Sequence, residues 1–212
     1  MRDVIGLIVF ALLTGLVAVS APRSYAAEAP TTADLAKAFG FPSTTPGTTD
    51  VRIWLGEGIV VPEIVYRLYE DADGRVRGQV IQWLRLHDAT YEGHPTNREL
   101  TRLMRKDCAT PPQVAGPLLW CDRRIDNDTL RITLKDLQLE TMFSYSDAVT
   151  GNCRHFMEDG ETVTIEWIRG EETRRLSISN PDFCCSEPVC AYVNNARDVV
   201  LRHMRAPWGQ AK

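Results

Sequence analysis

Cysteine is the residue type with the clearest chemistry in this chain of 212 residues. An even number of cysteines forms disulfides in an exported protein, or binds zinc together with a histidine such as His155. The spacing of Cys184, Cys185 and Cys190 matches none of the usual zinc patterns, so we predict disulfides, no metal site and no cofactor. The six cysteines are Cys108, Cys121, Cys153, Cys184, Cys185 and Cys190.

Local sequence narrows the pairing of these cysteines. Cys108 and Cys121 flank a loop of turn-forming residues, and closing a loop of that length stabilises a fold by about 3 kcal/mol. The other four lie around a hairpin predicted below, whose register, extended outward, places Cys153 opposite position 188. We therefore expect Cys153 to bond one of the two adjacent cysteines, and the other of the two to bond Cys190. A bond between the adjacent pair is the alternative.

No second set of residues assembles a recognisable chemistry. The four histidines lack a metal-binding frame, and the chain has no serine nucleophile motif and no phosphate-binding glycine loop. Residues 71–74 begin like a calcium loop, but Gln82 stands where such a loop requires Glu, so a hairpin turn explains them better. Without a motif that selects an acid–base pair from the carboxylates, we predict no catalytic residue and no enzyme. The residues considered are His87, His94, His155 and His203, with Glu57, Glu63, Glu70, Asp71, Glu158, Asp159, Glu161 and Glu166.

The candidate binding residues lie on one predicted hairpin. Residues 63–70 and 75–86 alternate as strands, and a three-residue loop at 72–74 sets Tyr66 opposite Val80. One face of this hairpin is apolar, whereas the exposed face carries arginine and aromatic residues, which are enriched where proteins bind partners. The candidates are Arg67, Tyr69, Arg77, Trp83 and Arg85. The alternative is that a helix covers this face, or that arginine stacks on tryptophan on an ordinary sheet.

The remaining elements complete a mixed pattern of helices and strands. Strands are predicted at 51–55 and 118–121, and a second hairpin at 162–169 and 172–179, whose two-residue turn sets Ile165 opposite Leu176. Helices are predicted at 32–39, at 96–106 from a capping box, and at 188–204. Residues 129–137 favour a helix, with a strand as the close alternative. We predict an α+β fold in which an antiparallel sheet built from two hairpins carries two or three helices on one face and is stapled by disulfides.

The first 26 residues are typical of an export signal. Residues 4–21 are apolar or small and uncharged, Pro22 and Arg23 follow, and residues 24–26 form a cleavage motif. An uncleaved membrane anchor is the alternative. Cleavage leaves about 186 residues and moves the formal net charge from −4 to −5. We expect a periplasmic or secreted protein with an N-terminal segment and linker at 27–50, a single domain at 51–205 and a tail at 206–212.

The composition is that of an ordinary globular protein, and a net charge of −4 gives no basic field that would attract nucleic acid. We expect a non-catalytic extracytoplasmic interaction protein, an inhibitor or immunity-type binder. Its partner would be another extracytoplasmic protein or a cell-envelope component. No nucleic acid is expected, and membrane contact is expected only through the leader before cleavage. The alternatives are a small exported hydrolase acting on cell-envelope polymers and a small-ligand carrier.

Overall fold

The computed structural model describes residues 30–41, 47–56, 63–86, 96–108, 110–125, 130, 132–145, 161–182 and 188–204. The chain divides into two compact units, Met1–Gly40 and Phe41–Lys212. In the first unit, helix α1 spans Thr32–Ala38 and begins with a capping box between Thr31 and Asp34. None of the helices in the described residues combines the length and apolar content needed to cross a bilayer. The predicted leader lies outside these residues.

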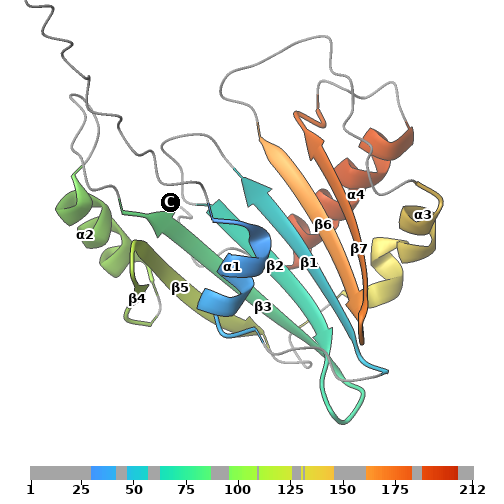
Figure 1. The fold of residues 1–212 in the computed structure, drawn as a ribbon, viewed down its shortest axis with the longest axis horizontal. Helices are drawn as coiled ribbons and strands as arrows, with labels where there is room; N and C mark the ends of the chain where they lie inside the picture. Colours follow the sequence, from blue (N-terminus) through green and yellow to red (C-terminus); the bar gives the residue numbers. More distant parts are fainter. Residues whose placement is uncertain are drawn as a thin grey trace, which may run out of the picture. The chain divides into compact units, whose positions relative to one another are not determined.

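The second unit is built on a seven-stranded antiparallel sheet with the order β4-β5-β3-β2-β1-β6-β7 (Figure 1). The strands are β1 Thr49–Gly56, β2 Glu63–Glu70, β3 Val76–Arg85, β4 Gln113–Ala115, β5 Leu118–Ile125, β6 Thr162–Arg169 and β7 Glu172–Ser179. The helices are α2 Asn97–Asp107, the 3₁₀ helix η1 Leu134–Leu137, α3 Leu139–Phe143 and α4 Pro188–His203. The predicted α+β class is confirmed, but the sheet is larger than two hairpins and a short strand.

The turns set the register of the two hairpins. In β2–β3, Tyr66 lies opposite Val80, and the Asp71 carboxylate accepts hydrogen bonds from the backbone N–H groups of Asp73 and Arg75. The backbone bond from Arg75 is the main reason why the pKa of Asp71 is lowered. This carboxylate therefore builds a turn. In β6–β7, the turn begins at Gly170 with a φ of 61°, and Ile165 lies opposite Leu176. These are the cross-strand pairs that the turn chemistry predicts.

Strand β1 lies inside the sheet, between β2 and β6. The sequence predicts only a short strand at 51–55, whereas β1 has eight residues and pairs with β2 on one side and β6 on the other. Its partner β6 is more than a hundred residues away along the chain. The local sequence contains no information on this pairing, although the pairing decides which side chains are buried.

One face of the sheet and the helix α4 enclose the main apolar core. Alternate residues of the strands point to this side, including Ile53 of β1 and Ile165 of β6, and meet the buried stripe of α4. Figure 1 shows α4 and α3 on the same side of the sheet. The stripe of α4 consists of Val189, Cys190, Tyr192, Val193, Ala196 and Val200. At Gly78 of β3 the packing is so close that a Cβ atom would lie 2.9 Å from Leu130 Cδ1 and 3.2 Å from Ile125 Cβ.

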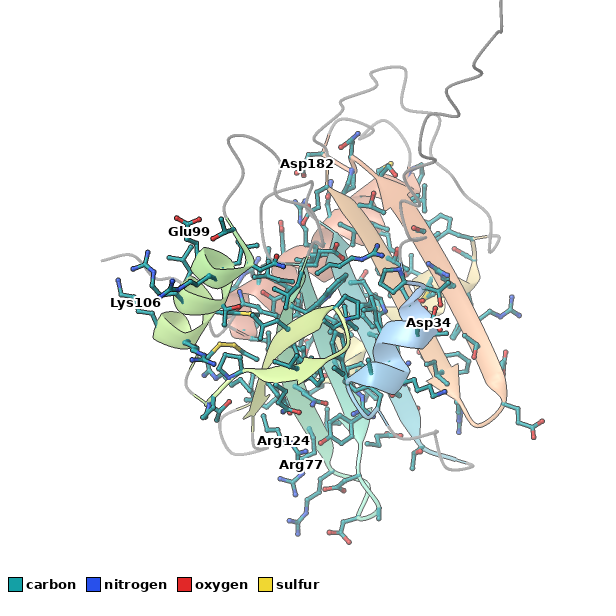
Figure 2. All side chains as sticks on the ribbon, turned by 60° about the vertical axis from the view of Figure 1, so that its left-hand side comes forward. Asp34, Arg77, Glu99, Lys106, Arg124 and Asp182 are labelled. Atoms are coloured by element: carbon teal, nitrogen blue, oxygen red, sulfur yellow. A yellow bond between two sulfur atoms is a disulfide. The ribbon has the colours of Figure 1, made fainter. Side chains whose placement is uncertain are left out.

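Polar contacts fasten α4 to the second hairpin. Arg197 donates to Glu161 at 2.7 Å, just before β6, and to Asp182 at 2.8 and 3.0 Å, just after β7. The hydrogen bonds from Arg197 hold the pKa of Asp182 below its usual value. Figure 2 shows Asp182 beyond the end of the β6–β7 hairpin. The sequence expects disulfides to make this link; Cys190 is buried in α4, and Cys153, Cys184 and Cys185 lie outside the described residues.

The segment between β5 and β6 differs from the predicted helix at 129–137. Residues 130, 132 and 133 are not helical, η1 covers only 134–137, and α3 follows at 139–143. Thr133 and Asp136 form a capping box that starts the 3₁₀ turn. Gln138 has a left-handed φ of 48°, which ends this turn before α3 begins.

A smaller core joins α2 to the β4–β5 end of the sheet. Met104 of α2 is fully buried against Leu119 and Cys121 of β5. The predicted Cys108–Cys121 disulfide is confirmed, with its Cα atoms 5.9 Å apart. The loop that it closes was predicted to be turns only, but it contains the short strand β4, and β5 continues four residues beyond the predicted end at Cys121.

Candidate functional site

The face of the sheet opposite α4 carries a row of polar side chains that crosses six strands. Alternation places these residues on one face, and the registers place them in one line. From β5 to β7 the row is Arg124, Gln79, Arg67, Arg52, Glu166 and Arg175. The four central members are less than 9% exposed, so most of the row is held away from water. Buried polar groups are stable only where they are hydrogen-bonded.

Asp50 of β1 is the shared acceptor of this network. Its carboxylate accepts from Arg52 at 2.8 and 3.2 Å and from Nε of Arg67 at 3.0 and 3.1 Å. Asp50 is 1% exposed, Arg67 is 4% exposed and Arg52 is 7% exposed. One buried carboxylate therefore serves two buried guanidinium groups, which leaves one unit of positive charge in excess within this group of three.

The network continues towards β5 through Gln79. Arg67 donates from Nη1 to the Gln79 carbonyl oxygen at 3.1 Å, and Gln79 donates to Oδ2 of Asp122 at 3.0 Å. The other oxygen of Asp122 is buried and has no hydrogen-bond partner in the part of the chain that the structure describes. On the opposite side, the indole of Trp54 donates to Glu166 at 2.8 Å. The face thus carries a chain of charge-assisted hydrogen bonds from Asp122 to Arg52, and beside it the bond between Trp54 and Glu166.

Aromatic rings lie against the two guanidinium groups. The guanidinium carbon of Arg67 lies 4.6 Å from the ring centroid of Phe41 and 4.1 Å from that of Tyr69. The guanidinium carbon of Arg52 lies 4.9 Å from the ring centroid of Phe41. Such contacts stabilise a cation and restrict the orientation of its plane. Each guanidinium also keeps one terminal nitrogen, Nη1 of Arg52 and Nη2 of Arg67, without a hydrogen-bond partner among the described residues.

The structure brings the five sequence-predicted binding residues to this face, but the face is not exposed as predicted. Arg67 and Trp83 are each only 4% exposed, whereas Tyr69, Arg77 and Arg85 are half-buried. The reason is that β2 lies inside the sheet, where Asp50 of β1 neutralises Arg67. Arg77 is drawn to the turn, where it donates to Asp71 at 2.9 Å. Sequence reasoning missed Asp50 and Arg52, and it considered Glu166 only as one of many possible acids or bases; the alternation of Asp50, Arg52 and Trp54 was the available signal.

Glu63, at the first position of β2, is the carboxyl group on this face with the largest change in acidity. Burial raises its pKa from the usual 4.5 to about 7. Its cross-strand neighbour on β3 is Trp83, whose apolar ring offers the carboxylate little solvation. A folded-state pKa above the unfolded one means that the folded protein prefers the protonated acid. This contribution to stability is complete below pH 4.5 and is lost as the pH rises through about 7.

The Glu63→Gln variant is therefore expected to be more stable than the wild type in mild alkali. At about pH 8 the free energy of unfolding should rise by about 1–2 kcal/mol, a value reduced for the partial exposure of the side chain. At about pH 4 the two proteins should have equal stability, because both side chains are then neutral. Urea unfolding at both pH values measures the difference, and a gain that is independent of pH would contradict the assigned cause.

Metal and histidine chemistry can be assessed only in part. Within the described residues, no group of three or more His, Cys, Asp or Glu side chains is placed to hold a metal ion. His203 lies exposed in the last turn of α4, while His87, His94 and His155 fall outside the described residues. The electrostatic feature that the structure does define is the Asp50–Arg52–Arg67 group.

Fold and site together define an α+β protein whose antiparallel sheet has an apolar face beneath α4 and a hydrogen-bonded charged face opposite. No family model, curated protein or solved structure matches the chain. The function is therefore argued from the site alone.

Proposed function

We propose that the protein is a non-catalytic extracytoplasmic interaction protein that binds an anionic group of its partner at the Arg52–Arg67 pair. The observation that carries the proposal is that these two guanidinium groups share the single carboxylate of Asp50. A carboxylate or phosphate placed between the two unused terminal nitrogens would balance the excess charge. The partner of such an inhibitor or immunity-type binder would supply this group as an acidic side chain, or as an anionic group of a cell-envelope component.

The rigidity of the pair supports a binding role. Hydrogen bonds that the arginines donate to Asp50 and Gln79, together with the rings of Phe41 and Tyr69, fix both guanidinium planes before any ligand arrives. A site fixed in advance loses little conformational entropy on binding, and fixed guanidinium groups favour planar anions such as carboxylate and phosphate. Because the ring of Phe41 lies over both cations, we expect the ligand to enter beside this ring or to displace it.

The same geometry argues against catalysis by this face. The carboxylates of Asp50 and Glu166 are already engaged within the protein, since Asp50 accepts hydrogen bonds from Arg52 and Glu166 accepts one from the indole of Trp54. Glu63 titrates in a useful range, but the register separates its Cα from that of Glu166 by about 16 Å. Paired glycosidase carboxylates lie about 5–9.5 Å apart. The alternative function is a hydrolase of cell-envelope polymers. It would be supported only if the wild type degrades such polymers and the Glu63→Gln variant does not.

The compartment is part of the proposal. The Cys108–Cys121 disulfide is compatible with an oxidising environment, and we infer a periplasmic or secreted protein from it and from the predicted leader. The partner would then be another extracytoplasmic protein or an envelope component. The other alternative, a small-ligand carrier, would bind a free anionic molecule at the same site. Titration with a small anion therefore tests the site for a binding protein and for a carrier alike.

Inorganic phosphate is the probe that tests the anion site. Arginine Nε–Hε signals in ¹H–¹⁵N spectra report each guanidinium separately, and we expect saturable shifts confined to Arg52 and Arg67. Arg52→Gln should abolish the shift of Arg67, since the excess charge is gone while Asp50 keeps one partner. Arg175→Gln is the matched control, because Arg175 belongs to the same row and its replacement makes the same change of charge at an exposed position on β7. We expect this variant to leave the phosphate-induced shifts of Arg52 and Arg67 unchanged. Equal shifts of all arginines, or none at Arg67, would overturn the proposal.

A further inference from the structure

The outer face of α2 carries an uninterrupted basic stripe. Arg98, Arg102 and Arg105 are spaced four and three residues apart, which places them one above another on a helix, and Lys106 extends the stripe. All four side chains are exposed. Figure 2 shows Lys106 projecting away from the sheet. The opposite face of α2 is used for packing, since Met104 is fully buried against β5.

Among the described residues, little of this charge is balanced by acidic side chains. None of the four cations forms an ion pair or hydrogen bond with another described residue. Glu99 is the nearest acid whose placement is known, but its carboxylate accepts from the backbone N–H and hydroxyl of Thr96 at 2.8 and 2.9 Å. The backbone bond from Thr96 is the main cause that lowers the pKa of Glu99, and the charge of Arg102 is the smallest, so this acid serves mainly as the helix cap.

The stripe cannot be explained by helix stability. Like charges four residues apart disfavour a helix, and a cation in the first turn, as at Arg98, opposes the helix dipole. Arg105 and Lys106 in the last turn suit the dipole, but they do not account for the continuation of the stripe to the other end. An external anionic surface would remove the repulsion along the whole stripe.

The helix that carries the basic stripe is tied to the sheet, and apolar side chains are exposed on this helix and on β4. The disulfide of Cys108 follows directly after the last residue of α2 and ties the helix end to β5. Leu103, on the same helix, is 45% exposed, and Val114 of β4 is 62% exposed. In Figure 1, α2 and β4 lie at the same end of the sheet, beyond β5. Cations next to exposed apolar side chains are the combination that adsorbs to the interface of a bilayer.

We propose that this face of α2 docks onto a membrane surface that contains anionic phospholipid. Guanidinium groups bind phosphate with paired hydrogen bonds, and the stripe runs along one side of a straight helix that can lie flat on such a surface. Lipid is favoured over nucleic acid because the adjacent disulfide fits an oxidising compartment. The net charge of −4 does not prevent docking, since salt screens charges beyond about 8 Å. The site is separate from the Arg52–Arg67 pair.

Vesicle sedimentation tests the proposal with the full chain. Binding is measured to vesicles of phosphatidylcholine alone and of phosphatidylcholine and phosphatidylglycerol in equal parts, at low and high salt. Every variant carries the apolar leader, which would contribute to binding both kinds of vesicle. The ratio of the affinity for mixed vesicles to the affinity for phosphatidylcholine vesicles therefore removes this contribution. We expect wild-type protein to prefer anionic vesicles and to lose the preference in high salt.

The variants locate the binding face. Arg98→Gln/Arg102→Gln/Arg105→Gln should weaken binding to anionic vesicles about fivefold per arginine, on the order of a hundredfold in all. Arg169→Gln/Arg174→Gln/Arg175→Gln, with the same change in net charge on β6 and β7, should bind like the wild type. Arg102→Gln alone, which leaves most of the stripe intact, should lose about fivefold if the triple variant does not fold. Equal losses in both triple variants, no preference in the wild type, or binding to polyglutamate instead of vesicles would overturn the proposal.

Discussion

Asp50→Ala is expected to lower the free energy of unfolding by about 3–5 kcal/mol. Removing the carboxylate leaves the guanidinium groups of Arg52 and Arg67 buried without their shared counter-ion. A broken buried ion pair is far more damaging than a lost surface pair, because the remaining charge stays desolvated. Here two charges remain, although the rings of Phe41 and Tyr69 offset part of the cost. Urea unfolding followed by circular dichroism measures the loss.

Two further variants show whether the loss comes from uncompensated charge. Glu172→Ala removes an exposed carboxylate that lies 3.7 Å from Arg174, and it should change stability by less than about 0.5 kcal/mol. Replacing the group as a whole, with Asp50→Val, Arg52→Met and Arg67→Met together, should recover most of what Asp50→Ala loses. If Asp50→Ala were no more harmful than Glu172→Ala, the buried network would have no structural importance.

The charged face shows where local sequence stops being informative. The two hairpins can be predicted because their turns and alternation are contained within about twenty residues. The same alternation sorts Arg67 and Trp83 onto one face, and it does so correctly. It cannot reveal that Asp50 and Arg52 of β1 lie beside Arg67, because that requires β1 to be inserted between β2 and β6. Asp50 falls in the predicted linker, and Arg52 looks like an exposed residue of a short strand.

Strand β5 illustrates the same limit. Residues 122–124 are Asp, Arg and Arg, which read as the end of a strand that begins at Leu118. They remain in the strand because residues 121–125 pair with β3 on one side. On the other side β4 pairs only with residues 118–120, so among the described strands 121–125 form an open edge. Charged residues are favoured on such edges, since they discourage pairing with other chains. The strand predicted at 118–121 therefore ends four residues too early.

The basic stripe of α2 was within reach of the sequence, since the capping box of Thr96 and Glu99 fixes the helix frame and hence its faces. The sequence could not show how few acidic side chains lie around the stripe among the described residues. That depends on which elements surround α2, and in particular on how the helix end is joined to β5. The Cys108–Cys121 disulfide makes that connection.

Cys108→Ala/Cys121→Ala is expected to lower the free energy of unfolding by about 3 kcal/mol. The bond closes a loop with a sequence separation of 13, and the loss follows from the greater entropy of the opened unfolded chain. Alanine avoids placing a hydroxyl group at the buried position of Cys121. Urea unfolding without reductant measures the change, and hydrogen exchange of α2 should increase more than that of α4.

Wild-type protein unfolded with reductant present is the informative comparison. If Cys108–Cys121 were the sole disulfide, reduction would cost the wild type the same as the double alanine variant loses. We expect a larger cost, because the sequence predicts two further bonds among Cys153, Cys184, Cys185 and Cys190 around the hairpin that Arg197 fastens to α4. The double variant, which keeps these bonds, should then lose further stability when reductant is added. If reductant did not change the stability of the double alanine variant, the predicted bonds would be contradicted. Arg197 would then be the principal link between α4 and the hairpin.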